Sequence, residues 1–288
     1  MDKPLFVVFD GNAIVHRAYH AFKHTRPLTV PHTGELVSAV FGFAQMVLKT
    51  LGDLTPKCTA VAFDMKGPTF RHREYELYKA HRPPMPDDLA NQLGRVRELV
   101  EALNIPIYEL PAYEADDVIG ALCRQAVDEG MRAIIITGDA DAMQLVSSEV
   151  GVLYPKPGRS FSDTALFDAD MVKGKFGVGP ELVADYKGLV GDKSDNIPGV
   201  PGVGEKTALT LLLKFGDIES IYQRLDEVMP PRVQALLQEN RPMAELSKKL
   251  ATIDQDAPVV FNRELCVTSQ YDREQAAAFF AELGFKSL

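Results

Sequence analysis

Leu5-Phe6-Val7-Val8-Phe9-Asp10 gives the clearest indication of the fold. A continuous apolar run of this length is typical of a β-strand that is buried on both faces of a parallel sheet. The run ends at Asp10, and open α/β sheets place ligand chemistry at the carboxyl ends of their strands. A single Asp more often begins a turn, but here the stretch predicts a central strand with a candidate functional carboxylate.

The same pattern occurs twice more along the chain. Thr59-Ala60-Val61-Ala62-Phe63 is followed directly by Asp64, and residues 132–137 are followed by Gly138-Asp139-Ala140-Asp141. Three strands that each deliver an Asp at the same end weaken the explanation by turns. Since parallel strands end at one edge of a sheet, these acids are expected to gather there.

Amphipathic helices are predicted between the strands. Residues 34–51 and 88–104 carry apolar side chains at helical spacing, and residues 105–108 indicate a further short strand. Alternating strands and helices with right-handed crossovers indicate the α/β class, with a mainly parallel central sheet flanked by helices.

Residues 113–120, Tyr-Glu-Ala-Asp-Asp-Val-Ile-Gly, concentrate acids at the start of a predicted helix. The positive end of the helix dipole explains one or two such acids. Three acids in four residues need a further explanation. Glu114 and Asp117 lie on one face of the helix and repel each other unless a cation lies between them. With Asp116, they are candidate metal ligands.

Residues 66–86 interrupt the alternation with a basic segment that ends in Pro83-Pro84-Met85-Pro86. Its cations are Lys66, Arg71, Arg73, Lys79 and Arg82, and the rings between them are Phe70, Tyr75 and Tyr78. Cations suit the phosphates of a single strand and rings suit its bases. A surface helix whose tyrosines pack on the domain is the alternative, but the position directly after Asp64 places the segment over the acidic pocket and favours a functional role.

The alternation fades after Tyr154, which predicts an α/β domain over 1–177 and a mostly helical region over 178–288. The remaining predicted elements are helices over 168–176, 180–189, 228–239, 243–252 and 272–283, and a strand over 258–261.

A glycine-proline hairpin lies between two predicted helices within residues 188–216, directly after Asp192 and Asp195. Glycines allow close approach, and backbone N–H groups at a helix start form a non-specific phosphate cradle. Glu205 stands where a P-loop needs Lys, and Thr207 stands where a dinucleotide fingerprint needs Gly or Ala, so both nucleotide motifs are excluded.

Composition places few limits on the class of protein. The 288 residues are 46% apolar and 25% charged, which is ordinary for a globular chain. Apolar runs reach strand length only, and the first strand leaves no room for a signal peptide, so we expect a cytoplasmic protein without a membrane span. Cys58, Cys123 and Cys266 lack the spacing of a zinc site or a disulfide framework and are predicted to be reduced core residues.

Nine acids form the candidate metal site: Asp10, Asp64, Glu114, Asp116, Asp117, Asp139, Asp141, Asp192 and Asp195. With no His or Cys among them, the set selects Mg²⁺ or Mn²⁺ over zinc, copper or iron. So many carboxylates exceed the needs of one octahedral ion, which implies two ions roughly 3.5–4 Å apart that activate water and stabilise charge on the phosphorus and the leaving 3′ oxygen. Phosphodiester hydrolysis is favoured, since no Ser-His-Asp or Cys-His set supports a covalent route.

The net charge of −9 argues against a nucleic-acid partner at first sight. Without the nine candidate ligands, however, the 40 Asp and Glu would fall to 31, equal to the 31 Lys and Arg. Bound divalent cations would neutralise much of the excess and leave a surface able to meet a polyanion.

Six groups of residues occur in a specific order: Val8-Phe9-Asp10-Gly11 with Arg17-Ala18-Tyr19-His20, Val61-Ala62-Phe63-Asp64, Phe70-Arg71-His72 with Tyr78-Lys79-Ala80-His81-Arg82, Tyr113-Glu114-Ala115-Asp116-Asp117, Gly138-Asp139-Ala140-Asp141, and Gly191-Asp192-Lys193-Ser194-Asp195-Asn196-Ile197-Pro198-Gly199. In this order they resemble the 5′-nuclease domain at the amino end of bacterial DNA polymerase I and, more broadly, the flap endonuclease family. The resemblance spans essentially the whole chain.

The resemblance implies an activity and a set of catalytic roles. All nine acids would line the metal site, with Lys79, Arg82 and Arg17 near the reacting phosphate. Residues 66–86 would form a helical clamp through which a 5′ single strand passes. Tyr78 would stack on a base, and Arg71 would be one of the DNA-contacting cations of this clamp. The implied reaction removes 5′ flaps and RNA primers near the junction of single strand and duplex, on flapped or nicked DNA and RNA–DNA primer junctions, in replication and repair.

The resemblance also assigns the hairpin. It would be a helix-hairpin-helix element that holds the downstream duplex through Gly199, Gly202, Gly204 and Lys206, and in some relatives it carries a monovalent cation.

Other functions stay open at the level of the sequence. Asp139-Ala140-Asp141 after a strand resembles an aspartyl-nucleophile loop, which would suit a Mg²⁺-dependent phosphatase, although that chemistry needs neither hairpin nor clamp. A non-catalytic binder of DNA structures would need far fewer acids. In the polymerases the chain continues past a segment like residues 279–288, so a separately encoded nuclease, expected to be a monomer, and the first part of a polymerase both fit.

Overall fold

The computed structural model describes residues 3–22, 27–156, 161, 163–268 and 273–285. Its centre is a six-stranded sheet in the order β3-β2-β1-β4-β5-β6. The strands are β1 (Leu5–Asp10), β2 (Cys58–Ala62), β3 (Ile107–Tyr108), β4 (Arg132–Ile136), β5 (Val150–Pro155) and β6 (Thr164–Phe167). Neighbours from β3 to β5 pair in parallel, and β6 joins the edge antiparallel. The predicted mainly parallel sheet is confirmed.

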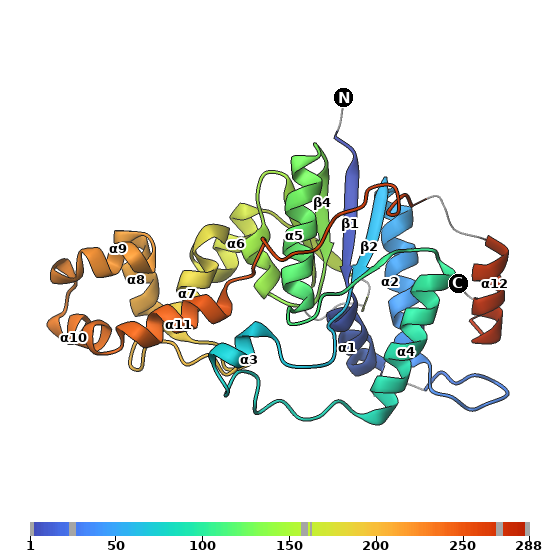
Figure 1. The fold of residues 1–288 in the computed structure, drawn as a ribbon, viewed down its shortest axis with the longest axis horizontal. Coiled ribbons are helices and arrows are strands. Elements are labelled where there is room, and N and C mark those ends of the chain that lie inside the picture. Colours follow the sequence, from blue (N-terminus) through green and yellow to red (C-terminus); the bar gives the residue numbers. More distant parts are fainter. Residues whose placement is uncertain (1–2, 23–26, 157–160, 162, 269–272, 286–288) are drawn as a thin grey trace.

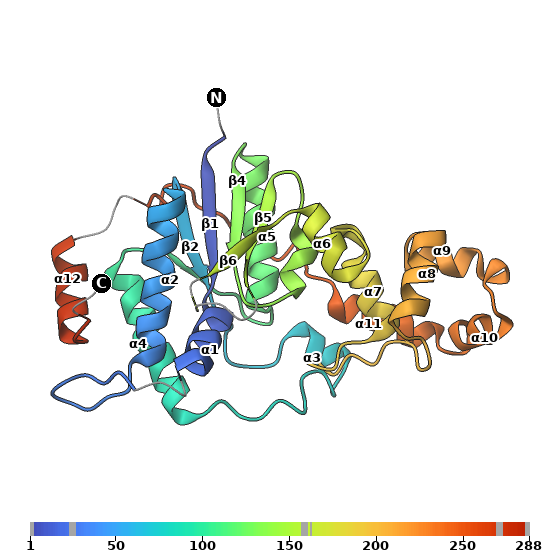
Figure 2. The same ribbon diagram turned by 180° about the vertical axis from the view of Figure 1, so that it is seen from behind.

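Helices cover both faces of the sheet (Figures 1 and 2). The covering helices are α1 (Gly11–Phe22), α2 (Ser38–Leu54) and α4 (Asp87–Ala102) on one face, and α5 (Ala115–Asp128) on the other. Successive side chains of a strand point to opposite faces. Val7 and Phe9 therefore join the core beneath α1 and α2, whereas Phe6 and Val8 join the core beneath α5. This two-sided burial is why β1 is apolar throughout.

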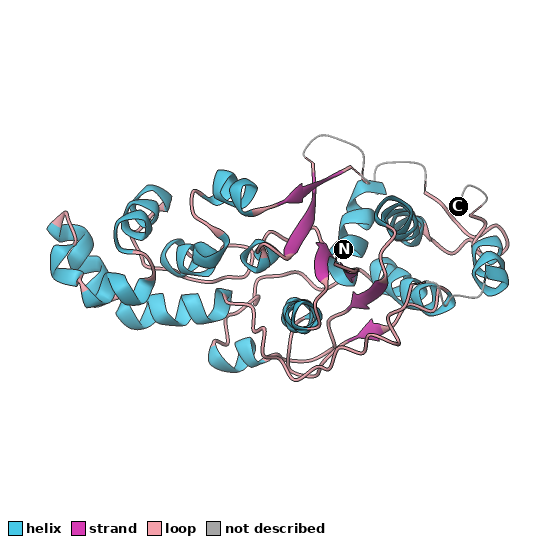
Figure 3. Ribbon diagram, turned by 90° about the horizontal axis from the view of Figure 1, so that it is seen from above, coloured by secondary structure: helices cyan, strands magenta, loops and turns pink. Residues whose placement is uncertain are grey.

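After β6 the chain forms a helical lobe with an apolar core of its own, which includes Leu189, Leu212 and Ile221. Its helices are α6 (Ala169–Phe176), α7 (Val183–Val190), α8 (Glu205–Phe215), α9 (Ile218–Gln223), α10 (Pro231–Glu239) and α11 (Arg241–Ala251), with 3₁₀ turns η2 (Pro180–Leu182) and η3 (Leu225–Glu227). A further 3₁₀ turn, η1 (Asp141–Leu145), lies earlier in the chain, between β4 and β5. The lobe projects from one end of the molecule, and α12 (Arg273–Glu282) lies at the other (Figures 1 and 3).

No helix within the described ranges combines the length and the apolar character that crossing a membrane requires.

The hairpin of β5 and β6 was not predicted from the sequence. Gly151 lies inside β5 and Pro155 ends it, and both residue types ordinarily indicate turns. β6 is a half-buried edge strand, so its sequence lacks the continuous apolar run that reveals β1. The residues between the two strands include 157–160 and 162, which lie outside the described residues.

The strand predicted over residues 258–261 is wrong. The backbone there is satisfied by one side chain of α5, because Gln125 Nε2 donates to Val259 O at 2.8 Å and Phe261 N donates to Gln125 Oε1 at 3.0 Å. A segment whose polar groups bond to a helix side chain needs no neighbouring strand.

Candidate active site

A cavity of about 400 Å³ opens at the carboxyl edge of the sheet. Asp10 ends β1, Asp64 follows β2 and Asp139 follows β4, while Glu114 and Asp116 come from the start of α5. All five carboxylates line the cavity. The structure thus brings together five of the nine acids, and parallel strand direction is the reason that three of them meet.

Backbone N–H groups at helix starts fix two of these carboxylates. Asp10 Oδ1 accepts from Ala13 N at 2.9 Å, and its Oδ2 accepts from Thr137 Oγ1 at 2.6 Å. Asp64 Oδ1 accepts from Ala115 N at 2.8 Å. Because a helix N-terminus stabilises negative charge, both acids are held in place without any cationic side chain in these contacts.

Sequence reasoning missed Asn12 and His16, which line the same cavity from α1. Asn12 Oδ1 accepts from Asp64 N at 3.0 Å and so ties the end of β1 to the end of β2. Their position in the sequence could have identified them, because both lie in the helix that begins directly after Asp10.

The cavity carboxylates have an unbalanced charge. Burial, with smaller contributions from Asp64 and Asp139, raises the pKa of Asp10 to about 7. Burial and repulsion from Asp139 and Asp10 raise the pKa of Asp116 well above its usual range. Carboxylates that repel one another in a desolvated pocket favour a bound cation, and an all-oxygen set fits Mg²⁺ or Mn²⁺. Within the described ranges, however, no three His, Cys, Asp or Glu side chains are placed closely enough to hold one ion together.

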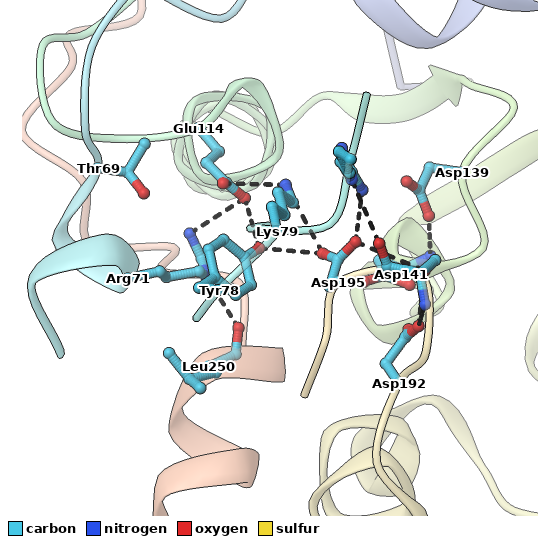
Figure 4. Close-up of polar contacts among 12 residues, drawn as sticks. Thr69, Arg71, Tyr78, Lys79, Glu114, Asp139, Asp141, Asp192, Asp195 and Leu250 are labelled. Atoms are coloured by element: carbon cyan, nitrogen blue, oxygen red, sulfur yellow. Dashed lines mark hydrogen bonds and ion pairs between the residues drawn. The ribbon is translucent and has the colours of Figure 1, made fainter. Parts of the chain in front are cut away.

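Asp141, Asp192 and Asp195 lie beside the cavity without lining it, and each is paired with a cation (Figure 4). The buried Lys187 bonds both Asp141 and Asp192. Although burial opposes it, Lys187 together with Ser194 holds the pKa of Asp192 below its usual range. The sequence analysis did not identify Lys187. The only feature that could have indicated it is a cation placed among the apolar residues of a short helix.

Asp117 does not line the cavity and pairs with Arg71 instead. The two nitrogens of the guanidinium bond the two carboxylate oxygens at 2.7 and 2.8 Å, and Asp117 also accepts from the backbone N of Glu114 and Asp254. Arg71 is 2% exposed and Asp117 is 0% exposed. We therefore remove Asp117 from the candidate ligands and Arg71 from the candidate DNA contacts.

The clamp segment has one regular helix, α3 (Phe70–Glu74), followed by turns that cross below the carboxyl ends of the strands (Figure 1). Tyr78 is buried, and its hydroxyl lies 3.0 Å from both Glu114 Oε2 and Asp195 Oδ2. This ring anchors the clamp, so the prediction that it stacks on a base is replaced by a structural role.

Lys79 and Arg82 line the cavity from the clamp, and their contact with phosphates stays a prediction. Lys79 Nζ lies 2.9 Å from Glu114 Oε1, and Arg82 pairs with Asp195. The structure does not bring Arg17 into the cavity lining, because its guanidinium lies over the ring of Phe161, 4.7 Å from the centroid.

The hairpin glycines differ in their surroundings. Gly199 is buried with φ +64, and a Cβ there would lie 2.3 Å from the backbone N of Gly191. Gly202, Gly204 and Lys206 are exposed. These three stay candidate DNA contacts. Gly199 instead allows the backbone of the hairpin to lie close against the end of α7.

Gly199→Ala is expected to lower the free energy of unfolding by about 1–3 kcal/mol, because the added Cβ meets backbone and strains a left-handed φ. Gly204→Ala is the matched control, since its φ is −96 and no atom lies within 4 Å of a Cβ built there. A loss below about 1 kcal/mol is expected for it. Urea unfolding measures both, and equal losses would contradict the assignment.

Two sequence families match consecutive parts of the chain. Residues 5–177 match the family described as 5′-3′ exonuclease, N-terminal resolvase-like domain, and residues 178–274 match 5′-3′ exonuclease, C-terminal SAM fold. DNA polymerase I of Bacillus caldotenax is 43% identical over 285 residues, which are 99% of this chain and 32% of that protein. DNA polymerase I of Bacillus subtilis is 40% identical over 287 residues, 100% of this chain and 32% of that protein. The chain therefore spans about a third of the length of these curated relatives.

Solved structures share the fold. T5 5′-exonuclease with bound divalent metal ions (zinc) aligns with a TM-score of 0.74 at 16% identity over 98% of each chain. The catalytic core of Rad2 in complex with DNA substrate aligns with a TM-score of 0.52 at 16% identity, over 98% of this chain and 92% of that chain.

Proposed function

Because the chain belongs to the 5′-3′ exonuclease family, we propose that it is a structure-specific 5′ nuclease. It would hydrolyse phosphodiester bonds of 5′ flaps and RNA primers near the junction of single strand and duplex. The observation that carries the proposal is one cavity that holds five carboxylates opposite the cations Lys79 and Arg82. A phosphodiester needs both: acids for divalent ions, and cations for its oxygens.

We propose that Asp10, Asp64, Glu114, Asp116 and Asp139 hold divalent ions in the cavity, with Asp141, Asp192 and Asp195 serving a second ion. When bound, Mg²⁺ or Mn²⁺ supplies an activated water and neutralises the charge that develops on the phosphate. T5 5′-exonuclease binds divalent metal ions, which supports the same dependence here.

The protein's own cations would position the strand. Lys79 and Arg82 now pair with Glu114 and Asp195, and both acids belong to the proposed ligand set. Binding of metal ions would release these cations to the oxygens of the incoming phosphate. Arg82 is placed for this exchange, because its side chain is 48% exposed.

The helical lobe would hold the duplex. The hairpin is exposed at Gly202, Gly204 and Lys206, and its backbone N–H groups suit non-specific phosphate contacts. The catalytic core of Rad2, which shares the fold, was solved in complex with a DNA substrate. A monovalent cation at this hairpin belongs to the same proposal. We also propose that the two domains divide between residues 177 and 178 and that the protein is a cytoplasmic monomer. Polymerase domains in a longer chain are part of the same proposal.

Cleavage of a 5′-labelled flap duplex in Mg²⁺, beside an EDTA control, tests the proposal. Cutting near the junction that disappears in EDTA is expected, and a matched flap with ribonucleotides at its 5′ end tests primer removal. Tight binding without cutting would favour a non-catalytic binder. Hydrolysis of p-nitrophenyl phosphate with no cutting of DNA would favour a phosphatase.

A further inference from the structure

Lys187 is a buried cation fixed between two of the proposed metal ligands. Its side chain is 9% exposed, its Nζ lies 2.6 Å from Asp192 Oδ2, and it also bonds Asp141 Oδ1. Figure 4 shows the two carboxylates directed toward one another from η1 and from the turn after α7. One ammonium group thus links two segments that the proposed function assigns to a second ion.

Lys187 is held more firmly beside its carboxylates than the clamp cations Lys79 and Arg82 are beside theirs. Lys79 and Arg82 lie on the turns of the clamp, and the Arg82 side chain is 48% exposed. Lys187 lies in the last turn of α7, which packs against α11 and η1. The packing is close, because a Cβ at the neighbouring Gly188 would lie 2.9 Å from Lys248 Cβ. The packing of α7 therefore holds the Lys187 ammonium between its two carboxylates.

This fixed charge makes the two parts of the acidic site unequal. Asp10 is held by a hydroxyl and a backbone N–H, neither of which neutralises its charge. Asp141 and Asp192 share a full positive charge with Lys187. A divalent ion beside this pair meets repulsion from the ammonium as well as attraction from the carboxylates. The cavity also has cations, Lys79 and Arg82, but the proposed function releases them to the phosphate when ions bind. The cavity should therefore bind its ion more tightly than the Asp141 and Asp192 side.

We propose that Lys187 is an internal counter-ion that sets a weak affinity for the second divalent ion. It is a positioning residue, since it acts through the two carboxylates and needs no contact with substrate. The consequence is ordered binding: one ion occupies the cavity in the free protein, and the second binds firmly only when a DNA phosphate adds negative charge beside it. The inference rests on the proposed function, because it assumes that Asp141 and Asp192 are ligands.

Mn²⁺ titration of the DNA-free protein, followed by calorimetry and by electron paramagnetic resonance of free Mn²⁺, tests this. Wild-type protein should show one tight site and one weak site. Lys187→Met should bind the second Mn²⁺ at least about tenfold more tightly, because the repelling charge is gone. Lys187→Gln, whose amide still donates hydrogen bonds, should show the same gain if the methionine variant folds poorly.

Lys248→Met is the matched control. Lys248 also bridges two acids, Asp185 and Glu219, but it does so outside the cavity lining, so Mn²⁺ affinity should stay unchanged. Unchanged or weaker second-site binding in both Lys187 variants would overturn the counter-ion role. Absence of any tight Mn²⁺ site in wild-type protein would instead count against the proposed function, so the two failures are distinguishable.

Discussion

Asp116→Asn is expected to reduce the single-turnover rate of flap cleavage by about 10³-fold, the scale of losing a direct electrostatic contribution to the transition state. Asp116 lines the cavity, and its charge is opposed by burial and by Asp139, Asp10 and Asp141. An amide there cannot replace a carboxylate as an ion ligand. Rapid-quench kinetics in Mg²⁺ on a labelled flap measures the loss.

The same substitution should leave the free energy of unfolding unchanged or raised. Removing one of several charges that repel each other relieves strain when no cation is bound. Asp256→Asn is the control, since the Asp256 side chain is 80% exposed and lies outside the cavity lining, and its cleavage rate should match wild type. An Asp116→Asn variant that is folded and retains more than a tenth of the rate would refute the role of Asp116 as a ligand.

Arg71→Leu is expected to lower the free energy of unfolding by about 3–5 kcal/mol, because it leaves the buried Asp117 carboxylate without its cation. The carbonyls of Leu250 and Thr252 also lose their donors. Urea unfolding followed by circular dichroism measures the change.

Arg95→Leu is the matched control for Arg71. Arg95 also binds a carboxylate with two nitrogens, at 2.8 Å each to Glu35, but the two side chains are 27% and 28% exposed. A loss near 1 kcal/mol or less is expected for such a pair, about the upper range for exposed ion pairs. Replacing both Arg71 and Asp117 by leucine should recover part of the loss. If Arg71→Leu is as stable as wild type and only weakens DNA binding, the original prediction of a DNA contact is restored.

Strands β1 to β4 and the gathering of three acids were predictable, because the first follow from apolar runs in the sequence and the second follows from strand direction. A continuous apolar run predicts a strand buried on both faces, and parallel direction places Asp10, Asp64 and Asp139 at one edge. The family prediction is confirmed by the two consecutive family matches and by relatives about 43% identical.

The partner of each acid was not predictable, because it depends on contacts between distant segments. Asp116 and Asp117 are neighbours in sequence, yet Asp116 lines the cavity and Asp117 is buried against Arg71 from another element. Consecutive residues on a helix point in different directions, but spacing alone does not reveal which one faces the cavity. The burial of Tyr78 and the position of Lys187 likewise arise only when the clamp and α7 pack beside the acids.

Anomalous diffraction from crystals grown with Mn²⁺ and a cleaved flap duplex would locate the ions directly. Mn²⁺ is expected among Asp10, Glu114, Asp116 and Asp139, beside the terminal 5′ phosphate, with Lys79 and Arg82 turned from Glu114 and Asp195 to the phosphate oxygens. A cavity that holds no ion while DNA is bound, or a 5′ phosphate placed away from these carboxylates, would contradict the assignment of this cavity as the nuclease site.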